Sequence, residues 1–186
     1  MIGLIPELIT FRLITNEGYV LLTGAGQVHS ILPIRKLAMT LDYLFGRGVS
    51  KSVRAENTGF TYSRKTGRIR QIFMDDKLFA TLRSDGSLAL TIHGARILIV
   101  NQLFKSNLVM VTDEARSHIS EGRSVFARHV LEAGERIRPK AEVVVIDRKG
   151  ELLAVGRAVI SAKMMLRFKR GVAVKIRKGI LNSLDG

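Results

Sequence analysis

The sequence contains no cysteine among its 186 residues. Without a thiol, cysteine nucleophiles, cysteine-ligated zinc, iron–sulfur clusters and disulfides are all excluded. Tryptophan is also absent and aromatic residues make up only 6% of the chain. The content of 46% hydrophobic and 25% charged residues is nevertheless typical of a globular protein.

Acidic residues are scarce: 16 Asp and Glu stand against 30 Lys and Arg, a formal charge of +14. Residues 1–107 hold 14 basic and 7 acidic side chains and residues 108–186 hold 16 and 9, so each part carries +7. Such a charge captures polyanions, and a nucleic acid is the favoured partner. An anionic membrane surface and a merely solvated basic surface are the alternatives.

Long uninterrupted apolar runs are missing as well. The first 26 residues lack a basic leader and carry charges at Glu7, Arg12 and Glu17. They fit neither a signal peptide nor a membrane span, which needs about 20 apolar residues. We therefore expect a cytoplasmic protein that does not bind a membrane.

Residues 1–106 are predicted to form an α+β domain, a helix packed on a small antiparallel sheet. Apolar residues recur at helical spacing over 33–46, behind a first-turn proline. Three β-rich runs over 68–92, joined by Asp75-Asp76 and by Ser84-Asp85-Gly86, indicate a meander. A short helix should follow at 93–104, whereas residues 1–32 suggest two or three short strands.

Residues 107–186 are predicted to be mostly β. The sequence favours strands at 108–111, 124–131, 141–147, 151–160 and 171–177, with one helix at 112–122. Thr112 or Asp113 should cap that helix, and Gly122 should end it in the left-handed conformation. About 70 residues of this kind suit a small closed or nearly closed barrel.

No catalytic or metal-binding constellation is found. The four histidines (His29, His93, His118 and His129) have no metal-type spacing among themselves or with carboxylates. Asp75 and Asp76 fit a tight turn better than a pair of catalytic acids. No nucleophile elbow or complete phosphate-binding motif is present. We expect no catalytic residue, no metal and no cofactor; an enzyme with an unrecognised site is the alternative.

Three stretches could contact a phosphate backbone. In the first, residues 63–70, four basic side chains surround Thr66-Gly67: Arg64, Lys65, Arg68 and Arg70. If Arg68 begins a strand, Arg68 and Arg70 share one face. A solvated hairpin loop explains these residues equally well.

The second stretch, residues 167–178, contains no acidic residue. Lys169 and Arg170 precede Gly171, and Lys175 and Arg177 then alternate with Val174 and Ile176. This alternation places both basic side chains on one face of a strand while the apolar ones enter the core.

The third stretch, residues 121–130, offers a glycine at which a backbone can come close, followed by phosphate-binding side chains. We include Gly122, Arg123, Ser124 and Arg128 in the candidate site. Phe126 could stack on a base, but the lack of tryptophan favours a place in the core. A regular strand would put Arg128 on the face of Phe126, which leaves that choice open.

Residues 108–177 resemble a PUA domain, an RNA-binding pseudobarrel, in the glycine loop after the helix, in "ELLAVGRAVIS" and in "RGVAVKIR". "LDYLFGRGVS" and "SRKTGRIRQIFMDDKLFATLRSDGSLALTIHGARIL" are similar to the domain that precedes PUA in archaeal tRNA-guanine (archaeosine) transglycosylases. The resemblance starts near residue 33 and leaves residues 1–32 only loosely placed. It implies an RNA groove lined by Gly122, Arg123, Ser124, Arg128 and the strand from Arg170 to Arg177.

The catalytic (β/α)8 barrel of those enzymes takes about 250 residues and has no counterpart in this sequence. The resemblance therefore implies a non-catalytic protein that binds structured RNA, most of all tRNA. A separate catalytic transglycosylase chain is a possible partner, as in a split enzyme. A stand-alone RNA-binding factor in ribosome assembly or translation is the alternative.

Overall fold

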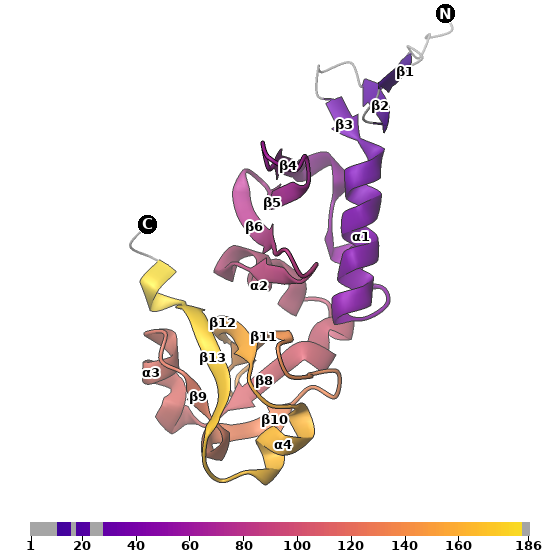
Figure 1. Ribbon diagram of the computed structural model, residues 1–186. Helices are drawn as coiled ribbons and strands as arrows, with labels where there is room; N and C mark the ends of the chain where they lie inside the picture. The colour runs from indigo at the N-terminus through magenta and orange to yellow at the C-terminus, as the bar shows by residue number, and fades with distance from the viewer. Residues whose placement is uncertain (1–10, 16–17, 23–27, 184–186) are drawn as a thin grey trace, which may run out of the picture.

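The computed structural model of the protein describes residues 11–15, 18–22 and 28–183 (Figure 1). Its first part is an antiparallel sheet in the order β1-β2-β3. The strands are β1 (Phe11–Thr15), β2 (Gly18–Leu22) and β3 (Val28–Ser30). The short strands expected before residue 32 are thus observed, while Asn16 and Glu17, between β1 and β2, lie outside the described residues.

The predicted long helix is α1 (Ile31–Phe45). Leu37, Leu41 and Phe45 recur every four residues and are buried, so they form the inner face of the helix. The Asp42 carboxylate accepts hydrogen bonds from the amides of Gly48 and Ser50, at 3.0 and 2.8 Å, and orders the chain after the helix. Burial alone would raise the pKa of Asp42, but these bonds outweigh it and lower the pKa.

The predicted meander is confirmed within an antiparallel sheet of order β4-β5-β6-β7. Its strands are β4 (Thr58–Tyr62), β5 (Ile69–Met74), β6 (Lys77–Leu82) and β7 (Leu88–Leu90), and α2 (Ile92–Ile99) follows. Asp75 and Asp76 both have positive φ, 50° and 59°, as a two-residue hairpin requires. The edge strand β4 was not predicted, because it buries only Thr58 and so lacks apolar alternation.

A six-stranded sheet in the order β10-β8-β11-β12-β13-β9 forms the second part of the fold. Its strands are β8 (Leu108–Val111), β9 (Val125–Phe126), β10 (Val130–Ala133), β11 (Glu142–Ile146), β12 (Leu152–Ala158) and β13 (Val172–Gly179). β8 and β11 are parallel and the other neighbours antiparallel. The mostly-β part with a barrel-like sheet is thereby confirmed.

The sheet curls because two consecutive strands lie at its opposite edges. Between β9 and β10 stands only the 3₁₀ turn Ala127–His129, so the two edges must come close together. The result is a nearly closed barrel, which leaves little free sheet edge. The prediction of one continuous strand over 124–131 was wrong, since this turn breaks it.

Two short helices accompany the barrel, α3 (Arg116–Ser120) and α4 (Ala162–Arg167). Gly122 has φ +92°, so the predicted left-handed end of α3 is confirmed. The predicted cap by Thr112 or Asp113 is wrong, because α3 begins after Ala115, which has no capping side chain. The Thr112 side chain makes no capping bond, and its Oγ1 lies 3.2 Å from Nδ1 of His129. α4 was not predicted.

Two hydrophobic cores share the strands β11 and β12. On β11, Val143 and Val145 face the barrel interior, whereas Val144 and Ile146 pack with α1, α2 and the four-stranded sheet. A strand buried on both faces needs a continuous apolar run, which β11 supplies. The four-stranded sheet is thereby fixed to the outer face of the barrel.

Substitution of Gly94 by alanine tests the close packing of α2 on β6. A Cβ at Gly94 would lie 2.2 Å from the carbonyl oxygen of Phe79. We expect Gly94→Ala to lower the free energy of unfolding by about 2 kcal/mol or more, because the clash exceeds the gain in helix propensity. Urea unfolding followed by circular dichroism measures this.

The matched control is Gly59→Ala, where the nearest atom, Cβ of Phe73, lies 3.8 Å away. The control should change the free energy by less than about 0.5 kcal/mol. Equal stability of the two variants would contradict the packing of α2 described here.

Candidate nucleic-acid interface

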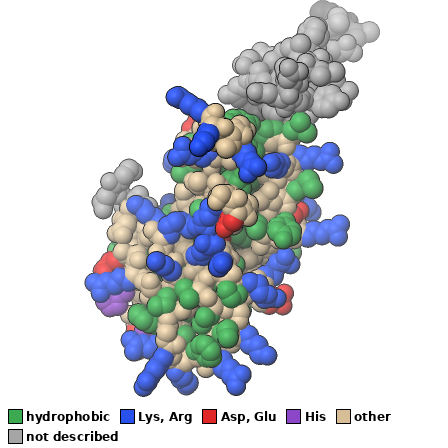
Figure 2. Space-filling view, in the orientation of Figure 1, with side chains coloured by type: hydrophobic (Ala, Val, Ile, Leu, Met, Phe, Trp, Pro, Cys, Tyr) green, Lys and Arg blue, Asp and Glu red, His purple; other side chains and the backbone are tan. Residues whose placement is uncertain are grey.

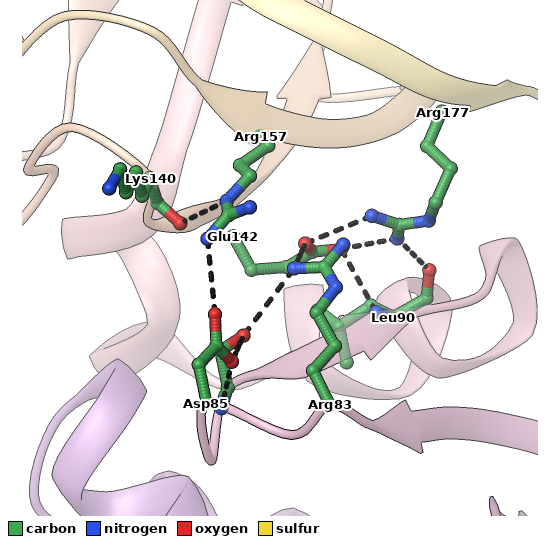
Figure 3. A network of polar contacts seen from close by, with 8 residues as sticks. Arg83, Asp85, Leu90, Lys140, Glu142, Arg157 and Arg177 are labelled. Atoms are coloured by element: carbon green, nitrogen blue, oxygen red, sulfur yellow. Dashed lines mark hydrogen bonds and ion pairs between the residues drawn. The ribbon is translucent and has the colours of Figure 1, made fainter.

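A buried carboxylate, Glu142, joins the four-stranded sheet to the barrel (Figure 3). Its Oε1 accepts a hydrogen bond from the amide of Leu90 on β7 at 2.9 Å. Arg177 on β13 binds both carboxylate oxygens, with Nη1 3.0 Å from Oε2, and also donates to the carbonyl of Leu90. Nη1 of Arg83 lies 3.5 Å from Oε2. One side chain thus connects three strands from both sheets.

Burial raises the pKa of Glu142, and the hydrogen bonds and charge of Arg177, the Leu90 amide and Arg83 offset this only in part. A raised pKa means that the folded protein binds a proton at Glu142 more tightly than the unfolded chain does. The stability gained from this proton is fully present at low pH and is lost as pH rises through the raised pKa. The pairing limits the cost of burying the charge, while the charge holds Arg83 and Arg177 in place.

A second contact crosses the same junction. Arg157 on β12 donates from Nε to the carbonyl of Lys140 at 2.9 Å, and its Nη2 lies 3.2 Å from Oδ2 of Asp85. In the register of the sheet Arg157 lies between Glu142 and Lys175, which are its partners on β11 and β13. Figure 3 shows Arg83, Arg157 and Arg177 gathered around the junction.

The structure therefore gives Arg177 a role that the sequence did not suggest. The Arg177 side chain is 34% exposed, and its guanidinium binds the Glu142 carboxylate. Lys175, two residues earlier on β13, is exposed, as the alternation predicted. Neither Arg83 nor Arg157 was predicted, because only the fold brings them beside β13.

The glycine loop lies against the last residue of β13. A Cβ at Gly179 would lie 2.1 Å from the carbonyl oxygen of Ser120 and 2.6 Å from the amide of Gly122. Asn182 also donates to the carbonyl of Glu121 at 2.9 Å. The Arg123 side chain is 69% exposed, and its Nε lies 3.6 Å from Oε2 of Glu121. Ser124 is half-buried. Gly122 therefore lies at the C-terminal end of β13, and Arg123 and Ser124 lead from there to Val125, the register partner of Val174.

The other end of β13 carries the remaining predicted residues of the barrel. Phe126 on β9 is the register partner of Val172, and the amide of Ala127 donates to the carbonyl of Gly171 at 2.9 Å. The Arg128 guanidinium lies 6.0 Å from the ring centroid of Phe126, a cation–π distance. Lys169 and Arg170 are exposed just before Gly171. Phe126, for which the sequence favoured the core but left the choice open, is 46% exposed.

β13 thus connects one arginine near its C-terminal end with a basic cluster at its N-terminal end. Arg123 stands at its C-terminal end, Arg128, Lys169 and Arg170 stand at its N-terminal end, and Lys175 lies between them. Eight strand residues span about 25 Å at roughly 3.3 Å per residue. That length suits several phosphates of one backbone, which Lys and Arg bind without reading sequence.

The basic hairpin of residues 63–70 lies elsewhere. Its basic side chains, Arg64, Lys65, Arg68 and Arg70, are all exposed. The Ser63 amide donates a hydrogen bond to the Arg68 carbonyl at 2.9 Å and closes the loop. Arg68 immediately precedes β5, so it does not begin the strand. The hairpin joins β4 and β5 at the edge of the four-stranded sheet remote from β7. Figure 2 shows Lys and Arg side chains on one face from this sheet to the lower end of the barrel.

None of the helices in the described residues is both long and apolar enough to cross a membrane.

Comparison with known proteins divides the chain into two matched regions. Residues 107–180 match the PUA domain, and residues 35–105 match the patch-forming domain C2 of tRNA-guanine transglycosylase. The chain is therefore a PUA-domain protein. It carries two domains, C2 followed by PUA, that are similar to a part of the tRNA-guanine transglycosylases.

Its relatives include the tRNA-guanine(15) transglycosylases of Thermoplasma volcanium and Pyrococcus abyssi. They are 38% identical over 147 and 148 residues, which is 78% and 79% of this chain but 23% and 25% of those enzymes. The chain thus spans about a quarter of the length of these relatives. A hypothetical protein from Pyrococcus horikoshii OT3 is similar in structure, with a TM-score of 0.66 and 25% identity over 82% of this chain and 95% of that one.

Removal of the Glu142 carboxylate should destabilise the whole fold. Glu142→Ala leaves the Leu90 amide and the Arg177 guanidinium without their buried acceptor, so we expect a loss of about 3–5 kcal/mol in the free energy of unfolding. The control, Glu151→Ala, removes an ion pair to Arg116 in which 56% of the Glu151 side chain is exposed. It should cost less than about 1 kcal/mol. Equal losses in urea unfolding would remove Glu142 from its central role.

Proposed function

We propose that the protein is a non-catalytic RNA-binding protein that binds tRNA through the face around β13. The observation that carries this is the line of exposed cations along one strand, with Arg123 at one end and Lys169 and Arg170 at the other. Phosphate contacts and the shape of the RNA would supply most of the affinity. Base-edge readout plays a smaller part in this proposal.

The family supports tRNA as the RNA. Both matched domains occur together in enzymes named tRNA-guanine(15) transglycosylase, and this chain aligns with about a quarter of each. We propose that the protein presents tRNA to a separate catalytic chain of that class. The hairpin of residues 63–70 would add a second phosphate contact from the four-stranded sheet.

The fixed junction between the two sheets supports a single extended surface. Glu142 holds Arg83 and Arg177 between the hairpin-bearing sheet and the barrel. Contacts to a folded RNA depend on the distances between its phosphates, so cations on two rigidly joined units discriminate shape better than cations on a mobile pair.

Binding to total tRNA and to a size-matched ribosomal RNA fragment, each over a salt series, tests the proposal. A preference for tRNA that persists near physiological salt would support tRNA presentation. Equal and steeply salt-dependent binding to both RNAs would reduce the basic face to a general polyanion surface. Preference for the ribosomal fragment would favour a role in ribosome assembly or translation.

Two single substitutions test the location of the surface. Arg123→Ala and Arg170→Ala should each weaken tRNA binding by about threefold to tenfold and reduce the salt slope by about 1. The control, Lys77→Ala, removes an exposed cation that follows Asp75 and Asp76 on β6, and it should change affinity by less than about twofold. Losses equal to those of the control would place the RNA on another face.

A further inference from the structure

Five large apolar side chains lie exposed at the end of the barrel that holds α4. We call them the apolar tip: Phe126, Val159, Met164, Leu166 and Phe168, with exposed fractions of 46%, 47%, 44%, 54% and 43%. Figure 2 shows hydrophobic side chains gathered at this lower end, with Lys and Arg around them. A folded protein keeps such a patch only at a cost, and contiguous patches mark binding sites.

Backbone contacts hold the members of the apolar tip together. Phe126 is the register partner of Val172, and the Val159 amide donates to the carbonyl of Ala173 at 2.8 Å, so both flank the start of β13. The Phe168 amide donates to the carbonyl of Met164 at 2.9 Å and ends α4. α4 lies against the turn Ala127–His129 that follows Phe126.

The segments that form this patch are rich in cations, and the exposed acid Glu132 lies on β10, which packs against α4. From residue 152 to residue 184 the chain holds no Asp or Glu, and no acidic residue occurs in 122–131. The exposed cations nearest in sequence to the patch are Arg128, Lys163, Arg167, Lys169 and Arg170. A nucleic acid complements both the apolar patch and the cations around it. The flat faces of its bases stack on aromatic side chains, and its phosphates are anionic.

From this combination we propose that the apolar tip is a platform for unpaired RNA bases, which stack on Phe126 and Phe168 while the surrounding cations hold their phosphates. Arg128 already lies over the Phe126 ring, and a guanidinium above a phenyl ring is also a surface on which a base stacks. The proposal rests on the proposed function and deepens it: the RNA is one whose base-paired part lies along β13 and whose unpaired bases reach α4.

Binding of the full chain to two RNAs tests the platform. One is a blunt hairpin and the other is the same hairpin with a short unpaired tail that contains 2-aminopurine. We expect the tailed hairpin to bind about fivefold to a hundredfold tighter than the blunt one, since stacking adds to the affinity of each base. The 2-aminopurine fluorescence should be quenched on binding, because the base becomes stacked.

Variants separate stacking from general effects. Phe168→Ala should remove most of the advantage of the tail and the quenching, leaving the affinity for the blunt hairpin unchanged, whereas Phe168→Trp should retain both. Tyr43→Ala is the control, since it removes an exposed aromatic residue from α1, 81% exposed and on the other sheet. Thermal unfolding of each variant confirms that it is folded.

The outcomes distinguish this inference from the function on which it rests. Equal affinity for the two hairpins, or a loss in Phe168→Ala that is the same for both, would overturn the base platform and leave the phosphate surface of β13 intact. In that case a protein partner would be the occupant of the apolar tip. Failure of either hairpin and of tRNA to bind would overturn the proposed function and the platform together.

Discussion

The buried carboxylate of Glu142 is the interaction on which the arrangement of the two sheets depends. It accepts a hydrogen bond from Leu90, 52 residues away in sequence, and binds the guanidinium of Arg177, 35 residues away. An apolar contact could slide by a fraction of an ångström, but a buried charge with directed hydrogen bonds has one favourable geometry. Glu142 therefore selects one orientation of the four-stranded sheet on the barrel.

The double use of β11 gives that orientation its stability. Val143 and Val145 belong to the barrel core and Val144 and Ile146 to the other core, so the strand cannot leave one without exposing the other. Hydrophobic burial supplies the free energy, and the Glu142 network supplies the geometry. The two sheets, and the basic side chains on them, are thereby held in one defined arrangement.

The sequence was informative where local chemistry decides the structure. The spacing of Leu37, Leu41 and Phe45 predicted α1, and the alternation of Lys175 with Val174 and Ile176 predicted the exposed face of β13. The conformation of Gly122 followed from its place after a short helix. In each case the neighbours in sequence were also the neighbours that set the structure.

Where partners come from distant segments, prediction from the sequence failed. The turn Ala127–His129 interrupts an apolar run because β9 and β10 must pair at opposite edges of the sheet, and this places Phe126 on the surface. Arg177 looked identical to Lys175 in the strand pattern, but a carboxylate 35 residues away binds only one of them. The missed α4 is six residues long, too short for periodicity to reveal.

The difference between Lys175 and Arg177 bears on how the surface works. A bidentate pair with Glu142 compensates the charge of Arg177 locally, so a phosphate gains less from Arg177 than from Lys175. Arg177 instead joins β13 to β7 through Glu142 and the Leu90 carbonyl, which fixes the position of the neighbouring Lys175. The basic strand β13 is thus held by an arginine whose own charge is directed at a carboxylate of the protein.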